Sequence, residues 1–235
     1  MKENIDNKFV LNRKIVIEIR FSPNPRILDL RGTIIKAFEP LNLHPIFHWE
    51  LGDLGLVIKD SPDMNVVRNQ ILVDLNKFAF ICSKIDSIES FYSKFNKIYE
   101  TIKLVIGDFT ITRIGCRIQG TYSVKSFSFE SILSNFKKVF TAQIFLDDFP
   151  VNDLRFQVNY QNGMYQTGPI NENDEFVKKE FPFLDRNKKI GIGIDTDNYL
   201  LNSNNEDLNK PTKIKDVLIA SLAVEKSLYE KMKDF

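Results

Sequence analysis

The sequence has few of the residues that mark specialised classes of protein. Among its 235 residues there are one Trp, two Cys and two His. Both cysteines, Cys82 and Cys116, lie in apolar, strand-like segments, so we expect buried, reduced thiols rather than a disulfide scaffold. No run of about 18 apolar residues occurs, and residues 1–8 lack the apolar core of a signal peptide. We therefore expect a cytoplasmic protein that is not in a membrane.

Charge of either sign is nowhere concentrated. The chain holds 32 Lys and Arg against 31 Asp and Glu, a formal net charge of +1, and neither half carries a charged block. Because the neutralisation of phosphates needs clustered cations, this balance disfavours bulk electrostatic binding of DNA. A basic face that forms only in three dimensions is left open.

Phe, in contrast, is abundant, with 20 residues. A Phe side chain buries a large area and has no polar atom to satisfy, so most of these residues should lie in the core. The apolar content of 43% and the charged content of 27% are ordinary for a globular protein, and the chain is long enough to bury a substantial core.

The clearest helix lies at residues 86–106. Its apolar residues recur at steps of three and four, at Ile88, Phe91, Phe95, Ile98, Ile102 and Val105. This spacing predicts one apolar stripe packed on the core, and the segment is too short to favour a coiled coil. Asp86 followed by Glu89 resembles a capping box, and Gly107 is a typical helix end.

The segments on either side of this helix follow a similar order. Before it, the pattern predicts a loose arm at 1–12, a strand at 14–21, a helix at 26–38 and an antiparallel meander at 46–51, 54–60, 66–75 and 77–83. After it, we expect a strand at 110–124, a helix at 127–140, a hairpin at 154–160 and 164–167 turning at Asn162-Gly163, a polar loop at 171–180, a strand at 189–197, a polar linker at 202–210 and a helix at 212–232.

We interpret the fold as α+β with an internal structural duplication. Residues 1–109 and 110–235 share the order strand, helix, antiparallel strands and long helix, although their sequences are not similar. Each half is expected to form an antiparallel sheet with helices on one face, and the two halves to pack as one compact unit.

The two histidines do not predict a metal site. His44 and His48 are four residues apart, a spacing that suits metal binding on a helix. Pro45 lies between them and the surrounding residues are strand-like, which argues against a helix there. We predict no metal ion and no cofactor.

A second candidate metal site lies near the end of the chain. Asp195 and Asp197, with Glu206 at the twelfth position, resemble a calcium loop. However, Tyr199 stands where an oxygen ligand is needed and Leu200 stands where the sharp turn needs Gly. A strand end followed by a solvated loop is the better interpretation.

No pattern of catalytic residues stands out. The acidic pairs at 147–148 and 174–175 are neighbours in sequence, and neighbours on a strand point to opposite sides. Gly191 and Gly193 lie in an alternating strand and are not a dinucleotide fingerprint. There is also no phosphate loop and no nucleophile elbow. An enzyme is disfavoured, and we predict no catalytic residue.

Arg113 and Arg117 are the candidate binding residues. Alternation along the predicted strand at 110–124 puts both side chains on one face, together with Gly115. The face could bind an anion or a partner protein. The interpretation that the pattern favours is a solvent face, or intramolecular salt bridges of the arginines.

Several short motifs resemble a sporadically distributed prokaryotic protein family of unknown function and similar length. The motifs are 17–21, 69–75 with 78–80, 113–117, the acidic strand end at 193–197, and the final helix at 223–235. Residues 116–120 depart from the family's more aromatic, Asn-containing version. Such families resemble accessory genes of antiviral defence or toxin–antitoxin loci, which implies a partner protein rather than a reaction.

These observations lead to two main hypotheses. The first is a non-catalytic protein-binding accessory protein (an adaptor, an inhibitor or an antitoxin-like partner) of a prokaryotic defence or stress module, which an exposed aromatic patch would favour. The alternative is a nucleic-acid-binding protein that uses a duplicated, saddle-like sheet with Arg113 and Arg117. A contiguous positive face would favour it, and a face covered by helices would exclude it. An enzyme would need a deep pocket with convergent polar groups.

Overall fold

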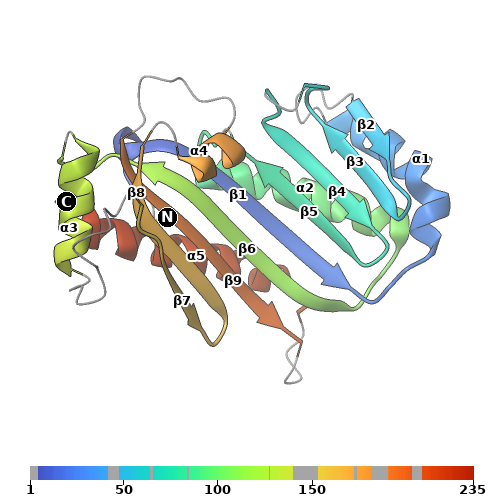
Figure 1. Ribbon diagram of the computed structural model, residues 1–235. Helices are drawn as coiled ribbons and strands as arrows, with labels where there is room; N and C mark the ends of the chain where they lie inside the picture. Colours follow the sequence, from blue (N-terminus) through green and yellow to red (C-terminus); the bar gives the residue numbers. More distant parts are fainter. Residues whose placement is uncertain are drawn as a thin grey trace. The chain divides into compact units, whose positions relative to one another are not determined.

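The computed structural model describes residues 5–41, 48–63, 66–83, 85–126, 128–139, 153–171, 174–181, 190–202 and 208–235. Within these residues, nine strands form one sheet in the order β2-β3-β4-β5-β1-β6-β9-β8-β7, and neighbouring strands run antiparallel (Figure 1). The same residues contain five α-helices. The predicted α+β class is therefore confirmed. The internal duplication stays a prediction.

The strands are β1 (Val10–Phe21), β2 (His48–Leu51), β3 (Gly55–Lys59), β4 (Asn69–Asp74), β5 (Lys77–Cys82), β6 (Ile111–Tyr122), β7 (Phe156–Tyr160), β8 (Gly163–Ile170) and β9 (Gly191–Leu201). The helices are α1 (Arg26–Phe38), α2 (Ile88–Ile106), α3 (Phe129–Val139), α4 (Glu175–Glu180) and α5 (Pro211–Met232). Two short 3-10 turns, η1 (Asn7–Phe9) and η2 (Glu39–Leu41), flank β1 and α1. The structure places the predicted elements close to their expected bounds, and α4 is the main addition.

The chain divides into two compact units. The first unit contains Lys14–Arg117 and Asn198–Ala220. The second unit contains Lys2–Arg13, Ile118–Asp197 and Ser221–Phe235. The predicted division into residues 1–109 and 110–235 concerns sequence halves and stays a prediction.

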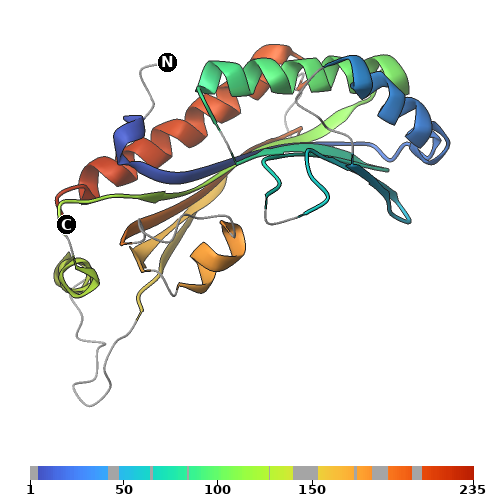
Figure 2. The same ribbon diagram turned by 90° about the horizontal axis from the view of Figure 1, so that it is seen from above.

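The core of the first unit lies between its strands and the helices α1 and α2, which cover the same side of the strands (Figure 2). Every second residue of β1 from Ile15 to Phe21 is buried, as the alternation predicts. Phe78 of β5 stacks on Phe95 of α2 at 6.2 Å between ring centroids, and Tyr99 lies within 6.5 Å of Phe95. Each such ring contributes roughly 1.5–3 kcal/mol by its burial.

The second unit has its own core. It is built from Ile5, Tyr122, Ile132, Phe136, Ile192, Ile194, Tyr229 and Met232, all of which are nearly inaccessible to solvent. Phe136 of α3 stacks on Phe156 of β7 with a centroid distance of 6.1 Å. The even-numbered face of β9 therefore packs on α3 and the end of α5.

The free cysteines are buried, as the sequence predicted. Cys82 on β5 and Cys116 on β6 are each about 1% exposed, and neither forms a disulfide. The end of α2 is also as predicted, because Gly107 caps the helix with φ of 82°. A left-handed φ of this kind suits Gly, which has no Cβ to clash.

The start of α2 differs from the prediction by one residue. Ser87, not Asp86, is the N-cap, and its hydroxyl oxygen accepts a hydrogen bond from the Ser90 backbone N–H at 3.0 Å. Ser87 has the extended backbone that an N-cap needs, with φ of −152° and ψ of 157°. The capping-box motif placed the helix start too early because Ser and Asp are both good caps.

The predicted loose arm at residues 1–12 is wrong for the described part. Ile5 is only 4% exposed in the core of the second unit, and β1 already begins at Val10. The polar composition of the segment concealed this single apolar anchor.

The predicted hairpin turn at Asn162-Gly163 is shifted by one residue. Tyr160 pairs with Gly163, so Gln161 and Asn162 form the turn and Gly163 begins β8. Gly163 is needed because the Asp197 backbone passes close to it: a Cβ on Gly163 would lie 2.2 Å from the backbone oxygen of Asp197. The predicted polar loop at 171–180 is likewise corrected, since Glu175–Glu180 forms α4.

Candidate interaction surfaces

Arg113 lies on the face of β6 that does not carry the core residues of the first unit. Its Nη1 is 3.1 Å from Oε1 of Glu18 on β1, and its guanidinium lies over the Tyr199 ring at 4.9 Å from the ring centroid. A Cβ on Gly115 would lie 3.3 Å from the guanidinium carbon, so Gly115 leaves room for the flat group. Of the alternatives that the sequence left for Arg113, the structure therefore shows the intramolecular salt bridge.

The same carboxylate oxygen also serves a second arginine. Arg20 Nε donates to Glu18 Oε1 at 2.7 Å, so two guanidinium groups share one carboxylate. The Arg20 side chain is 49% exposed and that of Arg113 is 18% exposed. The three groups carry a net charge of +1. Because exposed ion pairs are weak, a phosphate or carboxylate of a ligand could compete with Glu18 for the two arginines.

Arg117 is exposed on the same strand. It lies four residues beyond Arg113, so alternation places both on one face of β6, as predicted. A binding role for Arg113 and Arg117 stays a prediction.

The edge strand β2 presents exposed apolar side chains. Trp49 and Leu51 are each 53% exposed on β2, and Leu54 in the following turn is 57% exposed. All four residues of β2 are exposed, and β2 is outermost among the described strands. Large apolar side chains in water at one edge are typical of an interaction site.

Two contacts hold this edge in place. Lys59 of β3 donates to Glu50 Oε1 of β2 at 2.5 Å, and the Lys59 side chain is only 4% exposed. Arg31 of α1 donates from Nη1 to the carbonyl oxygen of Gly52 in the turn at 3.0 Å. The exposed Trp49 therefore projects from a supported hairpin. The apolar spacing and motifs did not single out this hairpin, although the one Trp of the chain, between His48 and Glu50 in a strand-like segment, is a signal that could have indicated it.

A buried charge network lies in the second unit. Glu225 of α5 is 0% exposed and accepts hydrogen bonds from Arg13 Nε at 2.8 Å, from Arg13 Nη2 and from the Tyr122 hydroxyl. Burial alone would lower the pKa of Arg13, but Glu225 and Tyr122 raise that pKa above its usual value. Burial raises the pKa of Tyr122 well above 10, and the Glu225 charge adds to the effect. The network is closed to solvent, so its role is to join β1, β6 and α5.

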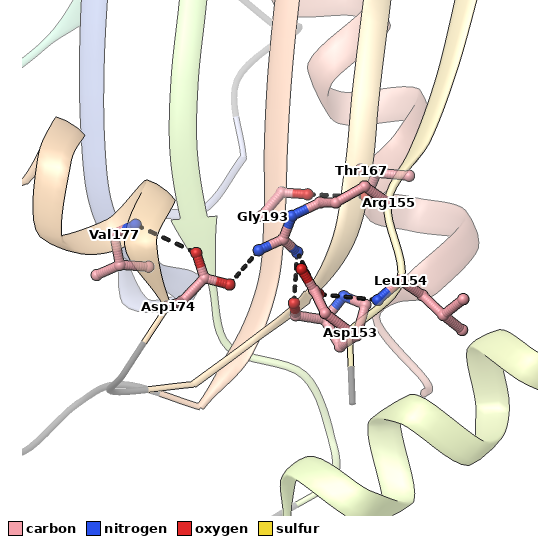
Figure 3. Close-up of polar contacts among 8 residues, drawn as sticks. Asp153, Leu154, Arg155, Thr167, Asp174, Val177 and Gly193 are labelled. Atoms are coloured by element: carbon pink, nitrogen blue, oxygen red, sulfur yellow. Dashed lines mark hydrogen bonds and ion pairs between the residues drawn. The ribbon is translucent and has the colours of Figure 1, made fainter. Parts of the chain in front are cut away.

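Arg155 is the centre of a second polar cluster in the second unit (Figure 3). Its Nη1 donates to the carbonyl oxygen of Pro169 at 2.6 Å, and its Nη2 donates to Asp174 Oδ2. Asp153 Oδ1 lies 3.6 Å from Arg155 Nη1, and the Asp153 side chain is 58% exposed. Asp174 also accepts a hydrogen bond from the Val177 backbone N–H at 3.4 Å, so it caps α4.

A small cavity of about 60 Å³ adjoins this cluster. It is lined by Arg155, Gln166, Thr167, Gly168, Gly193, Ile194 and Asp195. Asp195 is 3% exposed and accepts a hydrogen bond from Gln119 Nε2 at 3.2 Å. The space suits water rather than a substrate. Asp195 and Asp197 lie inside β9, as the strand interpretation expected, and Glu206 lies outside the described residues.

The other predicted candidates do not gather into a site. Among the described residues, no group of three or more His, Cys, Asp or Glu could hold a metal ion. His48 begins β2, whereas His44, Asp147 and Asp148 lie outside the described residues. A wider, open groove of about 580 Å³ runs along α2, and Tyr92, Asn96 and Lys215 are among its lining residues. Glu89, Lys97 and Glu100 also line it.

The chain matches no model of a protein family, and a search of curated proteins gives no match. The resemblance to a sporadically distributed prokaryotic family therefore stays a prediction. In the described part of the chain, none of the helices has both the length and the apolar character needed to cross a membrane.

Proposed function

We propose that the protein is a non-catalytic protein-binding accessory protein, an adaptor, inhibitor or antitoxin-like partner, and that β2 carries its interface. The observation that supports this most is the exposure of Trp49, Leu51 and Leu54 on one supported hairpin at a sheet edge. Trp is the residue most enriched among interface hot spots, and a monomer seldom leaves such side chains together in water.

The edge position indicates how a partner would bind. An edge strand has one row of backbone N–H and C=O groups that face outward, and an extended segment of another protein can pair with them. Trp49 and Leu51 are two residues apart, so they lie on one face of β2 and would contact alternate side chains of the added strand. The proposed occupant is an extended apolar segment of a partner protein, and the family resemblance suggests a partner encoded at the same locus.

The test is an affinity pull-down of the tagged protein expressed at its native locus. Trp49→Ser with Leu51→Thr should reduce recovery of a stoichiometric partner by at least about tenfold, the loss expected for a single hot-spot residue. The matched control is Leu104→Ser, because Leu104 on α2 is 85% exposed and lies in the same unit away from β2. Equal recovery with all three proteins would exclude β2 as the interface.

The internal duplication is part of this proposal. We infer it from the strand order of the sheet. In the first half, the first strand, β1, lies beside the last strand, β5, and in the second half the first strand, β6, lies beside the last strand, β9. The two halves then end at edge strands β2 and β7. We assign the interface to β2 rather than β7 because Trp49 and Leu51 of β2 are each 53% exposed, whereas Val158 and Tyr160 of β7 are 42% and 37% exposed.

A second candidate function is nucleic-acid binding on the face of β1 and β6. Its support is the pair Arg20 and Arg113, which together exceed the charge of Glu18, with Arg117 exposed on the same strand face. Helix α4 lies over the strands of the second unit on the side opposite α5, so this candidate is limited to the first unit (Figure 2).

The second candidate is tested by fluorescence anisotropy with labelled single-stranded and duplex oligonucleotides. Glu18→Gln should tighten binding because it removes the competing carboxylate, and Arg113→Gln should weaken it. Nucleic-acid binding is supported if the affinity rises in Glu18→Gln, falls in Arg113→Gln and weakens in both as the salt concentration increases. No binding at low ionic strength, or the same change in both variants, would exclude it.

A further inference from the structure

Strand β7 lies at the edge of the second unit. Among the strands that the structure describes it is outermost, and its register with β8 runs along Phe156–Tyr160. The backbone groups of a strand point alternately to its two sides, so half of those of β7 face away from β8. Natural edge strands often carry Lys, Pro or another charge that prevents further pairing, and residues 156–160 contain none. In the described part of the chain, β7 is therefore available to a further strand.

The sequence of β7 is symmetric in residue type about its middle residue. In both directions, residues 156–160 read aromatic, amide, Val, amide, aromatic. When a two-fold axis pairs a strand with its own copy, the two strands run antiparallel and one residue lies opposite itself. If that residue is Val158, then Gln157 lies opposite Asn159 of the second copy, and Phe156 lies opposite Tyr160 of the second copy. Every pair then joins side chains of the same kind, which indicates a second copy of this chain as the occupant of the edge.

One face of β7 would form an apolar strip across the two-fold axis. Alternation puts Phe156, Val158 and Tyr160 on this face. Phe156 is held by its stacking on Phe136 of α3, whereas Val158 and Tyr160 are 42% and 37% exposed. Pairing centred on Val158 would bring the two Val side chains together between two aromatic pairs, and cross-strand pairs of these types stabilise a sheet. The exposed apolar area of β7 would thus be removed from water.

The other face of β7 would form a cluster of amides at the same axis. Gln157 Nε2 donates to Asn159 Oδ1 at 3.2 Å within the strand, and both residues are exposed. A side-chain amide has two N–H donors and a carbonyl acceptor, so each can also hydrogen-bond an amide of the second copy. Neither face of residues 156–160 brings a charge to the axis, and the pairing therefore has no cost from the burial of an unpaired ion.

We propose that β7 pairs with β7 of a second copy, antiparallel and centred on Val158, so that the protein forms a two-fold symmetric homodimer. The sheets of the two second units then continue into each other across the axis. A pairing of five residues from each copy makes a small interface, and we expect a dissociation constant of about 1–100 µM. Because β7 and β2 are different strands, this proposal does not depend on the function proposed for β2.

The test is sedimentation-velocity ultracentrifugation of the full chain in about 0.15 M salt, at concentrations that span the expected dissociation constant. One variant combines Gln157→Lys with Asn159→Lys, and the other combines Gln157→Glu with Asn159→Glu. Each variant alone puts like charges directly opposite each other across the axis, so its dimerisation should weaken by about tenfold or more. An equimolar mixture of the two variants should dimerise as the wild type does, because each Lys then lies opposite a Glu.

The control is Trp49→Ser, which alters the exposed edge of the first unit and should keep the wild-type dissociation constant. Recovery of the dimer in the mixture also shows that both charged variants are folded. Loss of the dimer in each charged variant, with recovery in the mixture, supports pairing through β7. The proposal is overturned if the wild type is monomeric throughout, if the charged variants dimerise as the wild type does, if the mixture stays monomeric, or if Trp49→Ser abolishes the dimer.

Discussion

At the scale of single residues, the strongest constraint is the network of Arg13, Tyr122 and Glu225. Two charges are removed from water there, which costs more than their attraction returns unless every hydrogen bond is made. The network meets this condition, since Glu225 accepts from Arg13 twice and from Tyr122 once. Gly120 makes the arrangement possible, because a Cβ on it would lie 2.0 Å from the Tyr122 hydroxyl oxygen.

Loss of one charge of this pair should be severe. Glu225→Gln leaves the Arg13 cation buried without a counter-charge, and we expect the free energy of unfolding to fall by about 3–5 kcal/mol. Urea unfolding followed by circular dichroism measures this. The double variant Arg13→Met with Glu225→Leu should recover most of the loss because no charge is then buried. A loss below about 1 kcal/mol in Glu225→Gln would contradict the network's role.

The raised pKa of Tyr122 predicts a loss of stability in alkali. Its pKa is about 10 in the unfolded chain and well above 10 in the folded protein. Between these two values the unfolded state binds fewer protons, so the free energy of unfolding falls as pH rises, by about 1.4 kcal/mol per pH unit. Below pH 10 the contribution is fully present.

The measurement compares urea unfolding of the wild type and Tyr122→Phe from pH 9 to pH 11. The pKa of Tyr229 is also raised by partial burial, but both proteins retain that residue, so the difference in slope isolates Tyr122. Identical slopes in the two proteins would show that Tyr122 ionises without cost.

At the scale of elements, local chemistry decides where helix α2 begins and ends. Helix α2 carries most of the apolar face that the spacing predicts, since Ile88, Phe91, Phe95, Ile98 and Ile102 are buried. The predicted last member, Val105, is only half-buried, and Ile106 is buried in its place. Its ends depend on single residues, Ser87 at the start and Gly107 at the finish. The two candidate caps, Asp86 and Ser87, can be distinguished by substitution.

Ser87→Ala should lower the free energy of unfolding by about 1 kcal/mol, because the Ser90 N–H loses its acceptor. Asp86→Ala is the matched control and should change it by less than about 0.5 kcal/mol, the usual range for a surface substitution. Thermal or urea unfolding of both variants gives the comparison. A larger effect from Asp86 would restore the capping box that the sequence suggested.

At the scale of the whole molecule, the charges almost cancel. The formal net charge is +1, and the isoelectric point calculated from the sequence is about 7.7. Molecules near zero net charge repel each other weakly, so exposed apolar patches then dominate their association. Trp49, Leu51 and Leu54 are exposed apolar side chains on one hairpin, and we expect them to act as such a patch.

Static light scattering between pH 5 and pH 10 should therefore show the strongest attraction between molecules near pH 7.7. Trp49→Ser should weaken that attraction without changing its position on the pH scale, since the substitution alters no charge. Leu104→Ser serves as the control for an exposed apolar residue outside β2. An attraction that is unaffected by Trp49→Ser would mean that β2 is not the adhesive surface.

The sequence by itself determined the secondary structure and much of the core. Apolar spacing located α1, α2, α5 and most strands, because periodicities of 3.6 and 2 reflect one buried face within a single element. It also indicated the buried cysteines and the helix end at Gly107. These are local properties, and neighbouring residues are enough to specify them.

The tertiary structure alone decided which groups meet. Arg113 bonds to Glu18, which is 95 residues away in the sequence, because the strand order puts β1 beside β6. Arg13 of β1 bonds to Glu225 of α5 at a sequence separation of 212. Trp49 lies on an edge strand because that order puts β2 outermost among the described strands. Strand order depends on the packing free energy of the whole chain, which no local pattern encodes.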